Sequence, residues 1–131
     1  MTAAASMQPD RSAWHRPAMR AVRIALALAL TLALAFLAAG AAKLAGVAPL
    51  VELFERIGWG QWLRFVTAGV EIGGALLLLA PRTAWLGAGL LLATMAGATA
   101  TNLALGESPA GALVLGALAA LVLWIRRPGR I

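Results

Sequence analysis

The 131-residue chain contains no cysteine, one histidine and few charged residues. Without cysteine it cannot form a disulfide, build a zinc site on thiolates or act as a thiol catalyst. A single histidine, His15, cannot supply a multi-histidine metal or haem site, so the sequence predicts no metal site. Charged residues make up only 12% of the chain, against about 25% in typical globular proteins.

Apolar residues are present in great excess. They make up 62% of the chain, whereas about 45–50% is typical of soluble domains. A small soluble domain leaves much of its surface in water and could not bury so many leucines and alanines. Intrinsic disorder is excluded because disordered chains are poor in such residues. The composition therefore predicts one domain whose principal partner is the lipid bilayer.

Four apolar stretches predict membrane-spanning helices at about residues 24–42, 62–80, 84–105 and 109–125. A hydrocarbon core about 30 Å thick needs roughly 20 helical residues, which the first three stretches reach and the fourth nearly reaches. The predicted fold is an all-α membrane protein with a four-transmembrane-helix bundle. Residues 1–19 are expected to be a flexible cytoplasmic segment, residues 20–127 the transmembrane domain, and residues 128–131 a tail.

The piece between the first two stretches carries a helical pattern. Apolar side chains recur on one side at Leu50, Leu53, Phe54 and Ile57, and the other side carries Glu52, Glu55 and Arg56. This spacing predicts a short amphipathic helix in the membrane interface, beginning near Pro49 and ending near Gly58. An ordinary loop is the alternative.

The first apolar stretch also has an alternative interpretation as a signal peptide. Arginines precede it, and Ala39-Gly40-Ala41 fits a cleavage site. Against this, the apolar run is long, it follows a leader of considerable length, and Lys43 comes next in an amphipathic context.

Basic residues are distributed unevenly along the chain. Three groups would share one side of a four-span protein: Arg11, Arg16, Arg20 and Arg23; Arg82; and Arg126, Arg127 and Arg130. The positive-inside rule then predicts a multi-pass protein of the inner (plasma) membrane with both termini in the cytoplasm. Nucleic acid is not expected as a partner, since these residues flank apolar spans and form no continuous patch.

Glu71 is the one ionisable residue that falls deep within a predicted span. It lies roughly 14 Å along the second span, near the midplane, where a charge is costly. Desolvation at that depth favours the neutral acid unless a cation lies close. Two cations are candidates: Arg64, on the same helix face, and Lys43, whose long stem could lean in from the first span.

The candidate intramembrane polar cluster consists of Lys43, Arg64, Thr67, Glu71, Thr94 and Asn102. Its functional interpretation is a carboxylate that accepts a proton or binds a ligand. Its structural interpretation is a carboxyl that hydrogen-bonds Thr94 or a backbone carbonyl, with the threonines bonding their own helices. Asn102 could meet Lys43 or Arg64. No catalytic residue is identified.

Small residues recur at four-residue spacing, which lets membrane helices approach closely. Gly69 and Gly73 form a GxxxG pattern on the second span, pointing almost opposite Glu71. This pattern indicates a packed bundle and leaves a homodimer open.

Several short motifs together resemble the DoxX-like family of small membrane proteins, over about residues 20–127. They are Gly40 with Lys43 at the end of the first span, Ile57-Gly58, and Glu71 with Gly73-Gly74 ahead of a leucine run and a short basic turn. The resemblance implies a four-helix membrane bundle. Some relatives are associated with membrane oxidoreductase complexes that handle thiosulfate, thiol stress and quinones.

Three functions remain open at this point, and so does whether the protein is an enzyme. The first is an accessory or quinone-facing subunit of a membrane redox system; lacking cysteine, the chain would leave redox chemistry to partner oxidoreductase subunits or a bound quinone. The second is a small proton-coupled transporter that uses Glu71. The third is a structural or assembly partner with no chemistry of its own.

Overall fold

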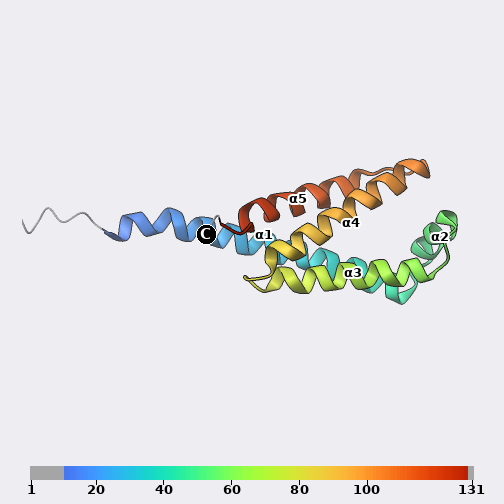
Figure 1. The fold of residues 1–131 in the computed structure, drawn as a ribbon, viewed down its shortest axis with the longest axis horizontal. Coiled ribbons are helices and arrows are strands. Elements are labelled where there is room, and N and C mark those ends of the chain that lie inside the picture. The colour runs from blue at the N-terminus through green and yellow to red at the C-terminus, as the bar shows by residue number, and fades with distance from the viewer. Residues whose placement is uncertain (1–10, 130–131) are drawn as a thin grey trace, which may run out of the picture.

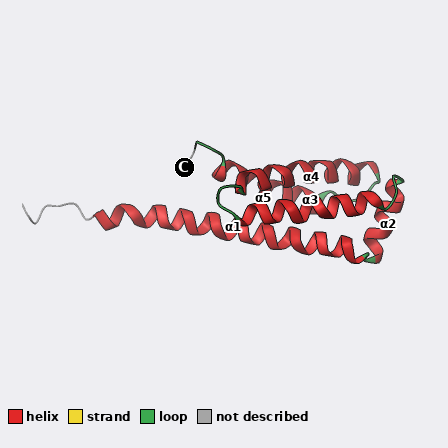
Figure 2. Cartoon of the chain, turned by 60° about the horizontal axis from the view of Figure 1, so that its bottom comes forward, coloured by secondary structure: helices red, strands yellow, loops and turns green. Residues whose placement is uncertain are grey.

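The computed structural model describes residues 11–129, with side chains from residue 18 onward. The described chain forms five helices and no strand: α1 (Arg11–Ala45), α2 (Ala48–Ile57), α3 (Trp62–Leu79), α4 (Ala84–Ala104) and α5 (Ala110–Arg126). Helices α1, α3, α4 and α5 run alternately in opposite directions, and α2 crosses one end of the bundle (Figures 1 and 2). The predicted all-α bundle is confirmed.

Helix α1 is longer than the apolar stretch that predicted it. It has 35 residues, about 52 Å at 1.5 Å per residue, and its first turns extend past the rest of the bundle (Figure 2). Residues 11–19, expected to belong to a flexible segment, are helical. Residues 1–10, which make up the rest of that segment, lie outside the described residues. The division of the chain into domains stays a prediction.

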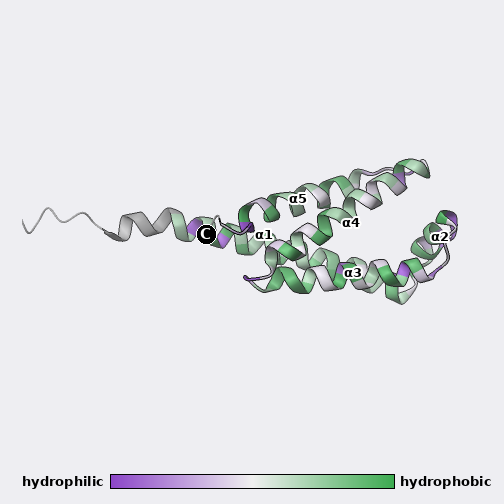
Figure 3. Ribbon diagram, viewed as in Figure 1, coloured by the Kyte–Doolittle hydropathy of each residue, from purple (hydrophilic) through white to green (hydrophobic). Residues whose placement is uncertain are grey.

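Among the residues that the structure describes, three helical stretches are long and apolar enough to cross a membrane: Ala18–Ala45, Trp62–Leu79 and Ala84–Ala104. The fourth bundle helix, α5, has 17 apolar-rich residues, about 26 Å, and packs along α4. Leucines point outward along these helices, for example Leu34 with 58% of its surface exposed and Leu76 with 56%. Figure 3 shows apolar residues along most of the length of the bundle helices, and the exposure of such large leucines is the pattern expected where lipid replaces water.

The bundle packs most tightly near the α3–α4 turn. A Cβ added to Gly87 would lie 2.5 Å from the carbonyl oxygen of Gly74, so these helices approach backbone to backbone there. The GxxxG pair Gly69 and Gly73 instead faces outward, with open space beside both positions. The small residues that close the bundle are therefore not the pair that the sequence pattern indicated, and a homodimer through that pair stays a prediction.

The amphipathic helix predicted between the first two spans is confirmed as α2. It has a proline in its first turn and ends at Gly58, whose φ of 82° is left-handed. Phe54 is buried and the charged side of the helix is exposed. From the α3–α4 turn, α4 and α5 diverge from α1 and α3 toward the end where α2 lies, as Figure 1 shows. Helix α2 thus lies across the wider end of the bundle.

Candidate functional site

An ion pair lies inside the bundle between α1 and α3. The Lys43 ammonium donates hydrogen bonds to both carboxylate oxygens of Glu71, each at 3.0 Å. The Glu71 side chain is 2% exposed and the Lys43 side chain 13%. Of the two cations considered for Glu71, Lys43 is therefore the one that compensates its charge, which lowers the cost of holding a carboxylate at this depth.

Close packing of α1 against α3 brings the pair together. Lys43 lies in the last turn of α1, and Glu71 lies in the middle of α3. One turn before Lys43, a Cβ added to Gly40 would lie 2.6 Å from the Ile72 side chain and 3.2 Å from the Ala68 carbonyl oxygen. The absence of a side chain at Gly40 therefore allows the approach that puts the Lys43 ammonium within reach of Glu71.

Arg64 has a different role from the one that its spacing to Glu71 suggested. Its guanidinium donates hydrogen bonds to the Lys43 carbonyl oxygen and, at 2.8 Å, to the side-chain oxygen of Gln61. It is 8% exposed and does not pair with Glu71. Arg64 therefore caps the carboxyl end of α1, which fixes the backbone from which the Lys43 side chain reaches Glu71.

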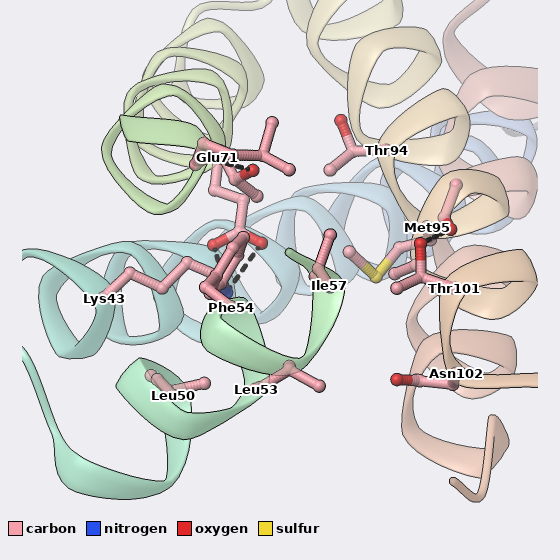
Figure 4. Close-up of a pocket in the computed structure, with 14 residues that line it drawn as sticks. Lys43, Leu50, Leu53, Phe54, Ile57, Glu71, Thr94, Met95, Thr101 and Asn102 are labelled. Atoms are coloured by element: carbon pink, nitrogen blue, oxygen red, sulfur yellow. Dashed lines mark hydrogen bonds and ion pairs between the residues drawn. The ribbon is translucent and has the colours of Figure 1, made fainter. Parts of the chain in front are cut away.

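A cavity of about 380 Å³ adjoins the ion pair, between α3 and α4 and beneath α2. Five of the six residues of the predicted cluster line it: Lys43, Thr67, Glu71, Thr94 and Asn102. Arg64 does not. Figure 4 shows the ion pair on one side, Thr94, Thr101 and Asn102 on the α4 side, and the apolar face of α2 below. We refer to it as the inner cavity.

The threonines of the predicted cluster are satisfied within their own helices. The Thr67 hydroxyl donates to the Leu63 carbonyl and the Thr94 hydroxyl to the Leu90 carbonyl, both at 2.8 Å. Thr94 therefore does not hold the Glu71 carboxyl. In the described part of the chain, no hydrogen bond joins Asn102 to Lys43 or Arg64. These side chains are thus placed around the inner cavity without being joined to the ion pair.

The apolar lining of the cavity was not among the candidate residues predicted from the sequence. Helix α2 contributes Leu50, Leu53, Phe54 and Ile57, α3 contributes Leu63, and α4 contributes Met95, Gly97 and Ala98. The helical spacing of the α2 residues was the available signal, since an amphipathic helix must direct its apolar face toward something. Among the described residues, no group of histidine, aspartate or glutamate side chains could hold a metal ion.

This arrangement suits a molecule with a polar head and an apolar body. A lysine ammonium has three N–H donors, and the two bonds to Glu71 leave one for an acceptor in the cavity. The Glu71 carboxylate has further lone pairs that can accept from a ligand hydroxyl. The volume lies within the range of about 300–1,000 Å³ typical of small-molecule sites, which are mostly apolar with a few polar groups.

A sequence model described as the DoxX-like family matches residues 26–125. That range includes every residue that lines the inner cavity. No curated protein and no solved structure matches the chain.

Proposed function

The chain belongs to the DoxX-like family, and on this premise we propose that it is a quinone-facing accessory subunit of a membrane redox system. The observation that carries the proposal is the inner cavity, in which an apolar chamber adjoins the Lys43–Glu71 ion pair. The described side chains include no thiol and no metal-binding group. A role in redox chemistry would therefore rest on a bound group or a partner.

The residues present fit the head group of a quinone. Lys43 offers an N–H to a carbonyl oxygen, and Glu71 offers a carboxylate to a hydroxyl. The apolar face of α2 and Met95 of α4 provide contact surface for a ring and its substituents. A bound quinone would supply two-electron, two-proton redox chemistry that these side chains lack.

In this proposal the chain's own residues bind, orient and hold a proton. Lys43 orients an acceptor oxygen, and the Glu71 carboxylate oxygens accept or return a proton at the polar end of the cavity. Arg64 acts indirectly, because it holds the backbone of Lys43 through its hydrogen bond to the Lys43 carbonyl. Phe54 and Leu53 exclude water from the side that α2 covers.

Proton-coupled transport through Glu71 is the weaker alternative. Transport needs access to the carboxylate from both sides of the membrane, by turns. On the side of Glu71 away from α2, the bundle is filled by side chains that are at most 2% exposed: Leu32, Phe36, Leu91 and Val122. The inner cavity reaches Glu71 from the α2 end, which suits a binding site better than a pathway.

The test is to measure the quinone that copurifies with the protein. The chain is purified from native membranes in mild detergent, extracted with solvent, and its quinone content determined by chromatography with ultraviolet detection. We expect quinone in the unaltered protein and its loss in Glu71→Ala and Lys43→Ala. Glu55→Ala, which removes an exposed carboxylate of α2 that lines neither this cavity nor its approach, is the matched control.

Each result of this experiment has a definite meaning. Unaltered protein that is free of quinone contradicts the proposal. Equal quinone content in the Glu71 and Glu55 variants contradicts the role given to the ion pair. A Glu71→Gln variant that folds, lacks quinone and still complements a deletion strain would favour the third interpretation, a purely structural or assembly partner.

The location and partners are also part of this proposal. We propose an inner-membrane protein with both termini in the cytoplasm, on the side of its arginine-rich ends, and oxidoreductase subunits as its protein partners. The α2 end, with the mouth of the cavity, would then face the other side of the membrane.

A further inference from the structure

A second cavity, of about 420 Å³, lies next to the inner one on the outer side of α2. Its lining is mixed, and its polar part consists of Glu52 and Arg56 of α2 on one side and Glu107 and Ser108 of the α4–α5 loop on the other. We call it the outer vestibule. Three residues line both spaces, namely Leu50, Leu53 and Asn102. The partition between the outer vestibule and the inner cavity is therefore two leucines of α2 and one asparagine of α4.

The two long edges of α2 are held by different kinds of contact. On the α3 side, Phe54 is 5% exposed, and the Gln61 side chain donates to the Val51 carbonyl at 3.1 Å. On the α4–α5 side, Arg56 pairs with Glu107 and donates to the Leu105 carbonyl at 2.8 Å. Both partners of that ion pair are about half exposed, at 48% and 49%. Solvent and salt weaken such an exposed pair, whereas they do not reach buried apolar packing.

Left-handed glycines lie at both ends of α2. Gly46 precedes the helix with φ of 72°, and Gly58 and Gly60 follow it with φ of 82° and 100°. Glycine adopts this region without the steric cost that other residues meet, so the two connections can change their dihedral angles cheaply. Helix α2 is thus a ten-residue helix between two glycine-containing connections.

We propose that α2 is a hinged cover of the inner cavity, held closed by Arg56, and that it opens on its α4–α5 edge to join the inner cavity to the outer vestibule. Phe54 stays packed and acts as the pivot, while Leu50 and Leu53 move away from Asn102. The route leads from water on the α2 side to the Lys43–Glu71 pair. This inference builds on the proposed function only in naming what would enter; the cover itself does not depend on a quinone.

The test measures how fast a charged thiol reagent reaches the inner cavity. The chain has no cysteine of its own, so each introduced cysteine is a clean reporter. Ala98→Cys places the reporter in the inner cavity, and Ser108→Cys places it in the outer vestibule, at an exposed position. The protein is reconstituted in phospholipid vesicles and treated with a trimethylammonium methanethiosulfonate, and labelling is followed by mass spectrometry.

We expect Ala98→Cys to react far more slowly than Ser108→Cys. Adding Arg56→Ala should speed labelling of Ala98→Cys about fivefold, the size expected for loss of an exposed ion pair and its accompanying hydrogen bond. Glu107→Gln should give a smaller increase, because Arg56 keeps its bond to the Leu105 carbonyl. Arg82→Ala is the matched control, since it removes the same charge at the other end of the bundle and should leave the rate unchanged.

Several results would overturn the cover. One is labelling of Ala98→Cys as fast as Ser108→Cys with Arg56 intact. Another is a rate that neither Arg56→Ala nor Glu107→Gln changes in protein whose tryptophan-monitored melting is normal. If Arg56→Ala increased the labelling rate of Ala98→Cys only with a lipid-soluble reagent, the inner cavity would be reached from lipid and not from water. Gated labelling in protein that carries no quinone would retain the cover and reject the proposed ligand, so the two failures are distinguishable.

Discussion

The Lys43–Glu71 ion pair joins the end of α1 to the middle of α3 in a place where both side chains are largely buried. A charge at such a depth is costly alone, and its partner removes most of that cost. The pair was one of two pairings that the sequence allowed. What decided between them is the direction of side chains on a helix, because Cα–Cβ bonds tilt toward the helix amino terminus. Arg64 near the start of α3 therefore points away from Glu71, and Glu71 points toward Lys43.

Removing one member of the pair should destabilise the protein more than removing both. Lys43→Met or Glu71→Leu leaves one buried ionisable group without its partner, at a cost of about 3 kcal/mol, whereas the double variant leaves none. We expect the double variant to melt above either single variant in detergent. Intrinsic fluorescence of the five tryptophans reports the transition. Strictly additive losses would show that the two side chains act independently.

Arg64→Met should destabilise the bundle although Arg64 lies outside the cavity. The substitution removes donors from the Lys43 carbonyl and the Gln61 side chain, and an unsatisfied buried acceptor costs about 1–3 kcal/mol. Arg64→Lys should recover part of the loss, and Arg82→Met, at an exposed turn, should change little. Melting curves that do not distinguish Arg64→Met from Arg82→Met would refute the capping role.

Hydropathy and length were sufficient to predict the helices α1, α3, α4 and α5. In lipid every backbone N–H and C=O group must find a partner within the protein, and a helix achieves this within one apolar stretch. Helix α2 followed from the spacing of Leu50, Leu53, Phe54 and Ile57. The amino-terminal extension of α1 did not follow, since the segment before Ala18 is polar and carries no span signal. The sequence also did not predict which face of each helix contacts another helix. Lipid is as apolar as the side chains, so hydropathy does not distinguish a face that packs in the bundle from one that faces lipid.

The glycines show that limit clearly and provide a matched pair for an experiment. An alanine at position 87 would bring its Cβ within 2.5 Å of the Gly74 carbonyl oxygen, so α3 and α4 must separate. We expect Gly87→Ala to lower stability by about 1–3 kcal/mol. Gly73→Ala adds the same methyl group in open space and should be neutral or stabilising by up to about 1 kcal/mol. The melting temperatures of the two variants check this, and loss of stability in Gly73→Ala would instead point to a partner on that face.

The whole bundle is asymmetric along its long axis. At the α3–α4 turn the backbones are in contact, and toward α2 the helices spread and enclose the inner cavity. The inner cavity could not be predicted from the sequence, because it exists only where the diverging helices α1, α3 and α4 meet α2, which crosses them. Its polar members could be predicted, since a carboxylate and an ammonium at membrane depth are rare enough to be conspicuous.

Charge is also distributed asymmetrically along the long axis of the bundle. The described end that carries Arg20, Arg23, Arg82, Arg126 and Arg127 has no acidic residue, and the α2 end balances its cations with Glu52, Glu55 and Glu107. Arg127 also lies over the Trp124 ring, 5.1 Å from its centroid, as expected for an interfacial anchor. The positive-inside rule therefore predicts that the arginine-rich end faces the cytoplasm.

We expect a membrane-impermeant maleimide to label Ser108→Cys in intact cells or spheroplasts, because Ser108 lies at the α2 end, which the proposed topology puts on the side away from the cytoplasm. Arg82→Cys and Gly129→Cys should be labelled only after the membrane is permeabilised, since the α3–α4 turn and the carboxyl-terminal end lie together at the other end of the bundle (Figure 2). The native chain has no cysteine, so unmodified protein gives the background. Labelling of Arg82→Cys and not Ser108→Cys in intact cells would show that the protein has the opposite orientation in the membrane. The Lys43–Glu71 pair would then be reached from the cytoplasm.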